Sequence, residues 1–379
     1  MRIDFNSSPT TSLGIEVELG IVDRTTRELV PHASWLLAQI GAGHPGGEHP
    51  KAKHELFECT VEVITGVCRT VSEARADLEA TLAPLVELAA GRDLALIGSG
   101  THPTSHWSTL PVTDDERYAD LVDRIQWPAR RLVIHGVHVH VGVASGEKAI
   151  AITNSLALHL PLFLALSASS PFWHGLDTGL ASCRTKVFEG LPTAGLPPQL
   201  AGWHEFEALM HTLMAAKAIE SIREIWWDVR PHPNFGTVEL RMCDGLSNLT
   251  EVSAIAALAQ SLVQWLSDRL DAGEALPSGP DWMIRENKWL AARYGLDAEL
   301  IVDADGNLRP VRDLVEDLVA TLGPVAGRLD CTIELDEVRA ILQRGPSYIR
   351  QRQVVEAGGS LHDVVDQLVA ELRTGVPRP

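Results

Sequence analysis

Residues 14–19 read Gly-Ile-Glu-Val-Glu-Leu, and this alternation of apolar and acidic side chains decides the fold class. Successive side chains of a β-strand point to opposite faces of a sheet, so Glu16 and Glu18 share one face while their apolar neighbours share the other. The alternation extends from Leu13 to Val22. It predicts a half-buried strand with one acidic face rather than a helix.

Two later segments repeat this pattern with other chemical groups. A Val-His-Val-His-Val segment places His138 and His140 on one face of its strand, and a Thr-Val-Glu-Leu-Arg-Met segment does the same for Glu239 and Arg241. For any one of these strands, the simpler interpretation is a sheet whose outer face is solvated. Three such faces together offer carboxylate oxygens and imidazole nitrogens, which are ligands of divalent cations.

The types of ligand indicate which cation to expect. Carboxylates with few imidazoles and no thiolate cluster favour Mg²⁺, with Mn²⁺ as the other choice, over zinc. Magnesium ions in proteins often bridge phosphate oxygens, so the pattern implies a nucleotide. Arg241 is placed to stabilise a migrating phosphoryl group. We therefore expect a magnesium and phosphate site on the polar face of the sheet.

The rest of the chain predicts an α+β domain. Thr70 and Glu73 form a capping-box signature before a helix at 71–90, and the chain beyond Asn248 is almost wholly helical. Strands that precede helices without regular alternation predict an antiparallel sheet covered on one face. We expect a single domain over 1–379, sheet-rich over 1–245 and mostly helical over 246–379. The other expected strands lie at 56–65, 94–97, 132–143, 225–230 and 236–243, and the other expected helices at 154–170 and 203–225.

Composition narrows the possible partners. The 379 residues include 32 basic and 50 acidic side chains, a net charge of −18, which argues against nucleic acid or an anionic membrane as the partner. An anionic nucleotide therefore needs locally placed cations. The five scattered cysteines suggest neither disulfides nor a zinc knuckle and fit the cytoplasm. The longest apolar run, 156–168, is too short to span a bilayer and predicts a buried helix.

Two motif matches lack the structural context that they need. Residues 41–46 read Gly-Ala-Gly-His-Pro-Gly, but a helix-like segment precedes them and no clear helix follows, so we expect no dinucleotide site there. Asp303-Ala-Asp-Gly lacks the rest of a calcium-binding loop and predicts a tight turn.

Further motifs carry a family resemblance. Together with the three strand motifs they occur in one order between about Leu13 and Tyr348, and they resemble the glutamate–cysteine ligase type 2 (carboxylate–amine ligase) family. The motifs are Val-Glu-Val-Ile-Thr-Gly at 61–66, Gly-Thr-His-Pro at 100–103, Leu-Ser-Ala-Ser-Ser-Pro-Phe-Trp at 166–173, Gly-Thr-Val-Glu-Leu-Arg at 236–241 and Glu-Asn-Lys-Trp at 286–289.

The resemblance implies a fold and a set of roles. The family is similar to glutamine synthetase, with a curved antiparallel sheet whose concave face holds ATP and two or three Mg²⁺ ions. The resemblance implies that Glu239 and Arg241 are catalytic, with Arg241 near the transferred phosphoryl group and His140 near the nucleotide. It implies one ion held by Glu16, Glu55 and Glu62, and another held by Glu18, His138 and Glu239.

Some of these assignments have alternatives. An odd spacing puts Glu55 and Glu62 on opposite faces of any continuous strand, so a bulge or bend is required, and Glu58 competes with them as a ligand. Arg184 matches a family arginine near a substrate carboxylate or phosphate, although an arginine on a surface loop is an equal alternative. Arg230 is a further candidate to reach phosphate. The Glu-Asn-Lys-Trp motif is expected to support the fold.

The resemblance also implies an activity. An ATP-dependent ligase of this kind forms an amide through an acyl phosphate, nominally from glutamate, or a similar acid, and an amine such as cysteine. A guanidino or carboxylate phosphotransferase and a non-catalytic ATP-binding regulatory protein are alternatives on the same fold. A metal-dependent hydrolase suggested by His138 and His140 lacks the other ligands of a catalytic zinc. The family further implies a homo-oligomer, with a dimer as the expected form.

Overall fold

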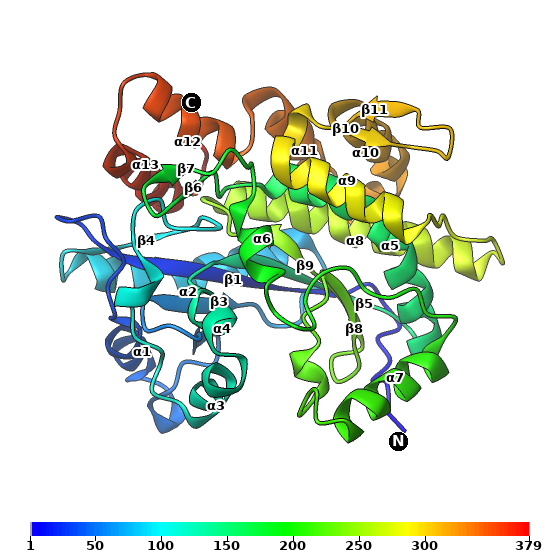
Figure 1. Cartoon of the computed structure of the whole chain (residues 1–379), viewed down its shortest axis with the longest axis horizontal. Coiled ribbons are helices and arrows are strands. Elements are labelled where there is room, and N and C mark those ends of the chain that lie inside the picture. The colour runs from blue at the N-terminus through cyan, green and yellow to red at the C-terminus, as the bar shows by residue number, and fades with distance from the viewer. Residues whose placement is uncertain (1, 379) are drawn as a thin grey trace.

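The computed structural model describes residues 2–378, and its centre is a seven-stranded sheet whose paired strands are antiparallel. The strand order is β2-β3-β1-β5-β9-β8, and β4 pairs with the last residues of β1. Figure 1 shows the sheet nearly edge-on, with helices on both sides. The α+β class is confirmed. The strands are β1 Leu13–Asp23, β2 Ala52–His54, β3 Thr60–Ile64, β4 Leu94–Ile97, β5 Gly136–Gly142, β8 Val229–His232 and β9 Thr237–Asp244.

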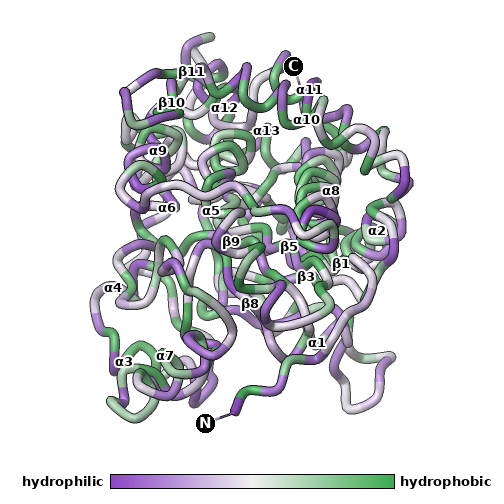
Figure 2. The backbone as a smooth tube through the Cα atoms, turned by 90° about the vertical axis from the view of Figure 1, so that its right-hand side faces the viewer, coloured by the Kyte–Doolittle hydropathy of each residue, from purple (hydrophilic) through white to green (hydrophobic). Residues whose placement is uncertain are grey.

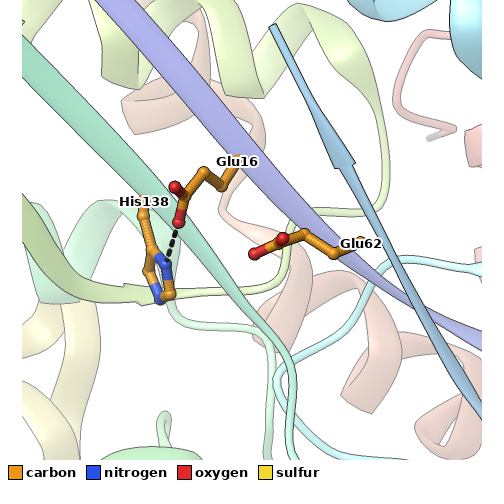
Figure 3. Close-up of side chains that lie close together, drawn as sticks. All are labelled: Glu16, Glu62 and His138. Atoms are coloured by element: carbon orange, nitrogen blue, oxygen red, sulfur yellow. Dashed lines mark hydrogen bonds and ion pairs between the residues drawn. The ribbon is translucent and has the colours of Figure 1, made fainter. Parts of the chain in front are cut away.

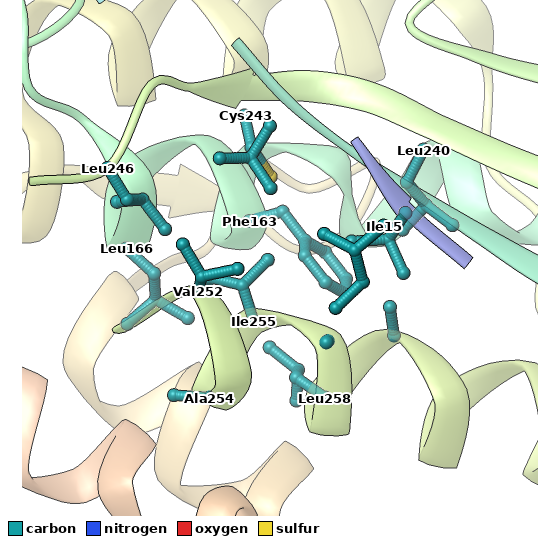
Figure 4. Packing of buried hydrophobic residues seen from close by; sticks show 14 of the residues in the cluster. Ile15, Phe163, Leu166, Leu240, Cys243, Leu246, Val252, Ala254, Ile255 and Leu258 are labelled. Carbon is teal, nitrogen blue, oxygen red and sulfur yellow. The ribbon is translucent and has the colours of Figure 1, made fainter. Parts of the chain in front are cut away.

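The apolar face of the sheet forms the floor of the main hydrophobic core. Ile15 and Leu240 from the strands cluster there with Phe163 of α5 (Gly146–Ser167) and Ile255 of α8 (Leu249–Asp271) (Figure 4). By length and composition both helices could cross a membrane, but 78% and 83% of their most apolar windows are buried inside the protein. Figure 2 shows their hydrophobic stretches within the fold. The apolar run 156–168 thus belongs to a buried core helix, as expected.

Further helices pack on the outer side of α5 and α8 or beside the edge strand β4. The helix α9 packs on α5, while α10 and α11 pack on α8, and α13 packs beside β4. The helix α2 contacts α8, β1, β3 and β4. The bounds are α2 Val71–Ala90, α9 Asp281–Tyr294, α10 Val311–Arg328, α11 Thr332–Arg344, α12 Ser347–Glu356 and α13 Leu361–Thr374.

The shorter elements lie around the sheet, and the first of them, α1, packs against α2, β2 and β3. In Figure 1, α3, α4 and α7 lie on the side of the sheet opposite to α8. The bounds are α1 Ala33–Gly41, α3 Glu116–Ile125, α4 Trp127–Arg130, α6 Cys183–Phe188 and α7 Trp203–Ala215, with a 3₁₀ turn at Ile222–Glu224.

Several expected boundaries are wrong. The strand expected at 56–65 begins only at Thr60, because the chain reverses direction over 55–59. The helix expected at 154–170 begins at Gly146, where the Ser145 side chain accepts a hydrogen bond from the Lys148 amide and caps the first turn. The strand expected at 132–143 begins at 136, the helix at 203–225 ends at 215, and the strand at 225–230 lies at 229–232.

Both rejected motifs lie in turns. Residues 41–46 run from the end of α1 into a 3₁₀ turn at Pro45–Gly47, with no strand before them and no α-helix opening there, so the Rossmann arrangement is absent from this described segment. The carboxylate of Asp303 accepts hydrogen bonds from the amides of Asp305 and Asn307. It thereby closes the turn between β10 (Glu299–Ile301) and β11 (Leu308–Pro310), two short strands that the sequence did not predict.

Candidate active site

The strand register brings the expected polar residues onto one face of the sheet. Glu18 on β1 lies opposite Glu62 on β3, and Glu16 on β1 lies opposite His138 on β5. His140 on β5 lies opposite Glu239 on β9. Four neighbouring strands thus contribute side chains to a continuous polar surface, which the alternation in each strand predicted without specifying the neighbours.

A bulge in β9 adjusts the edge of this surface. Val137 pairs with Cys243 but Val139 pairs with Leu240, so β9 carries one extra residue over this stretch. As a result the consecutive residues Met242 and Cys243 both belong to the hydrophobic core. Arg241 remains on the polar side, where its guanidinium reaches Glu239.

A hairpin provides the bend that the odd spacing of Glu55 and Glu62 requires. The two residues lie on either side of the chain reversal at 55–59, because Lys53 of β2 pairs with Glu62 of β3. Both carboxylates can therefore face the same way. Glu58, the competing candidate, lies in the reversal and accepts a hydrogen bond from the Ser34 hydroxyl at 2.6 Å, at the start of α1.

Three groups of these side chains bring one potential ligand atom each to within 4.8 Å of one another. They are Glu18 with Glu55 and Glu62, Glu16 with Glu62 and His138, and Glu16 with His140 and Glu239. The family resemblance implied that Glu16 shares an ion with Glu55 and Glu62, but the ligand atom that lies close to both of these residues belongs to Glu18. Glu16 instead connects the hairpin side of the site to the β9 side.

Glu16 is held between two imidazoles, and Figure 3 shows its contact with one of them, His138. His138 Nδ1 lies 2.9 Å from its Oε2 and His140 Nε2 lies 3.3 Å from its Oε1. Burial opposes ionisation, but the hydrogen bonds with these imidazoles outweigh it and lower the pKa of Glu16. Burial and the charge of Arg241 lower the pKa of His138 to about 4. A neutral His138 that donates Nδ1–H to Glu16 leaves its Nε2 lone pair free for a ligand.

The pKa values of Glu18, Glu55 and Glu62 are raised, whereas that of Glu16 is lowered. Burial and the negative charge of Glu55 raise the pKa of Glu18 to about 8. Burial likewise raises the pKa of Glu55, and burial with the charge of Glu55 raises the pKa of Glu62 well above its usual range. Partly buried carboxylates that repel one another either take up protons, as their raised pKa values indicate, or bind a cation that compensates their charge. The all-oxygen donor set fits a hard divalent ion such as Mg²⁺, whereas it does not fit a thiolate-seeking metal.

Glu239 lies between two arginines. Arg230 Nε is 2.7 Å from its Oε2, and the Arg241 guanidinium contacts its Oε1. Burial opposes ionisation here too, but the charges of Arg230 and Arg241 lower the pKa of Glu239 well below its usual range. Arg230 lies opposite Glu239 in the β8–β9 register, a pairing that the linear sequence does not reveal.

Arg184 is buried, so the alternative of a surface arginine is wrong. Its side chain is on α6 and is 3% exposed, with Nη1 3.4 Å from the carbonyl oxygen of Arg241. Its Nε is buried with no hydrogen-bond partner among the described residues. A buried guanidinium with an unused donor is suited to bind an anionic ligand.

A cleft of about 710 Å³ lies over this polar face. His232 and Phe235 stack at one end, with ring centroids 4.2 Å apart and an interplanar angle of 9°. Tyr118 of α3 borders the cleft as well, and no sequence signal pointed to it, because α3 is short and carries no fully buried residue. Despite the acidic composition, basic side chains gather in the lining: Lys53, Arg117, Arg124, Arg184, Arg223, Arg230 and Arg241.

Sequence comparisons give matches to known proteins over nearly the whole chain. A family model described as glutamate–cysteine ligase family 2 matches residues 12–368. A protein of Frankia casuarinae with the provisional name glutamate–cysteine ligase 2-1 is 56% identical over 100% of this chain and 99% of its own length. A Thermobifida fusca protein with the provisional name glutamate–cysteine ligase 2 is 50% identical over 100% of this chain and 94% of its own.

Solved structures with low sequence identity share the fold. A Francisella tularensis glutamate–cysteine ligase in complex with AMP has a TM-score of 0.70 at 13% identity, covering 97% of this chain and 89% of that one. A bifunctional glutathione synthetase from Pasteurella multocida has a TM-score of 0.68 at 14% identity, covering 96% of this chain and 52% of that one. The family match and the close relatives, rather than these distant structures, establish that the chain belongs to glutamate–cysteine ligase family 2.

Proposed function

We propose that the protein is an ATP-dependent carboxylate–amine ligase that works on the polar face of its sheet. The γ-phosphoryl group of ATP passes to a substrate carboxylate, and an amine attacks the resulting acyl phosphate to leave an amide, ADP and phosphate. Glutamate or a similar acid and an amine such as cysteine are the proposed substrates. The observation that carries the proposal is the cluster of buried carboxylates and arginines in one cleft.

The chain's own residues supply alignment and charge compensation. Arg184, Arg230 and Arg241 reach the cleft from α6, β8 and β9 and present guanidinium donors suited to phosphate and carboxylate oxygens. Glu16 stays ionised at neutral pH and orients His138 and His140. No protein nucleophile is needed, because the transferred group moves directly between substrates.

The residues proposed to hold magnesium are Glu16, Glu18, Glu55, Glu62, His138 and Glu239, and His140 belongs to the same group of neighbouring ligand atoms as Glu16 and Glu239. When bound, the ion would neutralise negative charge on the oxygens of the transferred phosphoryl group. Glu239 and Arg241 are the proposed catalytic pair. His140, Arg241 and Arg184 are the proposed contacts of the nucleotide.

The cysteines bear on the compartment in which the protein works. All five cysteines are buried free thiols, which fits a reducing cytoplasm. We place the protein there as a homodimer, with small molecules rather than nucleic acid or membranes as its partners. Light scattering that gives the mass of one chain would contradict the dimer.

Product analysis distinguishes ligation from its alternatives. Purified protein is incubated with ATP, Mg²⁺, glutamate and a panel of amines, and ADP and the products are followed by chromatography and mass spectrometry. We expect amide and ADP in equal amounts, dependent on both amine and Mg²⁺. A stable phosphorylated acid or guanidine without amide would instead support a phosphotransferase. Failure to bind Mg·ATP in calorimetry would support neither enzyme.

A further inference from the structure

A buried ammonium group behind the cleft joins two segments of its wall. Lys288 belongs to the Glu-Asn-Lys-Trp motif on α9, and its side chain is 2% exposed. Its Nζ lies 2.6 Å from Oε1 of Glu189 and 2.6 Å from Oδ2 of Asp228. Lys288 is not among the cleft-lining residues of the described chain. Any effect on substrates must therefore pass through these two carboxylates.

Both carboxylates adjoin elements that carry arginines into the cleft. Glu189 directly follows α6, whose second residue is Arg184. Asp228 directly precedes β8, which carries Arg230. The carbonyl oxygen of Asp228 also accepts a hydrogen bond of 2.7 Å from the Arg241 amide. One ammonium group thus sets the spacing between α6 and the two strands.

The opposite end of α6 is fastened to β9. Asp244 accepts hydrogen bonds from the hydroxyls of Ser182, at 2.8 Å, and Ser170, at 2.6 Å. The Ser170 hydroxyl in turn accepts a hydrogen bond of 3.0 Å from the Arg184 amide. With β9 holding its first turn and Lys288 holding its end, α6 is fixed at both ends beside the cleft.

Stability alone is a weak reason to bury the Lys288 ammonium group and the Asp228 carboxylate beside the partly exposed Glu189. Desolvation of a buried ion pair can cancel its Coulombic gain, and apolar side chains of the same volume are often as stable. An ammonium with short contacts to two carboxylates does impose a defined distance between them. The cluster is therefore suited to hold geometry rather than to add free energy of unfolding.

We propose that Lys288 is a positioning residue that sets the mutual placement of Arg184, Arg230 and Arg241. Its role in catalysis rests on the proposed ligase function, whereas its role in placing the arginines does not. Removal of the ammonium group lets α6 move relative to β8 and β9. A misplacement of about 1 Å in a site that works by alignment lowers turnover by about 100-fold.

The test uses the whole protein and compares four variants. Lys288→Met leaves the buried Asp228 carboxylate without its cationic partner, whereas Glu189 keeps its 2.8 Å contact with Lys186. We therefore expect lower stability as well as lower turnover. The triple variant Lys288→Met/Glu189→Gln/Asp228→Asn removes all three charges and should regain stability. Glu189→Gln, at a side chain that is 29% exposed, weakens the contacts of Glu189 with Lys288 and Lys186 and leaves the contact between Lys288 and Asp228 in place. The control Lys148→Met breaks a pair with Asp271, which links α5 to α8 away from the cleft.

The readouts are melting temperature, kcat and KM for amide formation, and a crystal structure of the triple variant. We expect kcat of the triple variant and of Glu189→Gln to fall about 10- to 100-fold at near-normal melting temperature, with Lys148→Met unchanged. The crystal structure should show the 3.4 Å contact between Arg184 and the Arg241 carbonyl broken. Normal kcat, or an unchanged arginine arrangement in the crystal, would overturn the proposal. Absence of amide in the wild type would overturn the ligase function instead, and the crystal structure would still decide the role of Lys288.

Discussion

At the scale of single residues, the polar face contains a fully buried glutamate, Glu239, and a partly buried one, Glu62, whose surroundings differ in charge. Glu239 is 1% exposed and already has two cationic partners, Arg230 and Arg241. Glu62 has acidic neighbours instead, and Glu18 lies directly opposite it on β1. The two glutamates serve the same proposed site, but they differ in what their removal does to the protein.

Glu239→Gln should destabilise the protein as well as abolish turnover. The neutral amide leaves Arg230 and Arg241 buried without a countercharge, which costs about 3–5 kcal/mol. Urea unfolding measures this loss, with Arg339→Met, at a surface pair with Glu316, as the control. A variant as stable as the wild type would show that the arginines do not depend on Glu239.

Glu62→Gln should stabilise the metal-free protein, in contrast to Glu239→Gln. Burial and the charges of Glu55 and Glu16 disfavour ionised Glu62, so a neutral amide should raise stability by about 1 kcal/mol while turnover is lost. Thermal unfolding in EDTA and a magnesium titration check both parts. If the variant were less stable in EDTA, or kept the full magnesium-induced shift in melting temperature, Glu62 would not belong to the proposed metal group.

At the scale of elements, strand alternation was enough to predict which side chains share a face. The helix at 71–90 and the strand at 94–97 were predicted with the observed bounds. The hairpin at 55–59 was missed, because a chain reversal within an alternating segment leaves the local pattern intact. Arg230 was named from the sequence as a candidate to reach phosphate, but its pairing with Glu239 depends on strand register, and the place of Tyr118 depends on the packing of α3, so neither could be predicted.

A buried ion network ties together the C-terminal helices. Arg350 of α12 contacts Glu251 of α8 at 2.8 Å and Glu371 of α13 at 2.9 Å. Arg350→Met leaves Glu371 without its arginine partner and leaves Glu251 with only the longer 3.4 Å contact to Arg344, so we expect a loss of about 3 kcal/mol in the free energy of unfolding. Because the network is remote from the cleft, kcat at low temperature should stay near normal. A large fall in kcat of the folded variant would contradict this separation.

At the scale of the whole molecule, a net charge of −18 coexists with a cleft that gathers arginines and mutually repelling carboxylates. The composition indicated that an anionic nucleotide would need locally placed cations. The fold collects those cations from distant segments, which composition cannot show. Membership of the ligase family came from motif order along nearly the whole chain, whereas the residue patterns alone indicated only metal and phosphate.

Metal-free protein should lose stability as pH rises toward 8. Burial and the charge of Glu55 raise the pKa of Glu18 from 4.5 to about 8, so the folded protein binds more protons than the unfolded chain between these values. Stability then falls with increasing pH in this window. Histidines with lowered pKa values oppose this slope only below about pH 6.5. Denaturant unfolding in EDTA from pH 6.5 to 8 should show a smaller slope for Glu18→Gln, and equal slopes would contradict the prediction.

The most direct test of the central claim follows an oxygen atom. The acid that supports amide formation is labelled with ¹⁸O in its reacting carboxylate and incubated with ATP, Mg²⁺ and the amine. Transfer of the γ-phosphoryl group to that carboxylate predicts one ¹⁸O atom in each phosphate released, in step with amide, and no transfer with Glu16→Gln. Phosphate that carries no label while amide accumulates would contradict ligation through an acyl phosphate at this site.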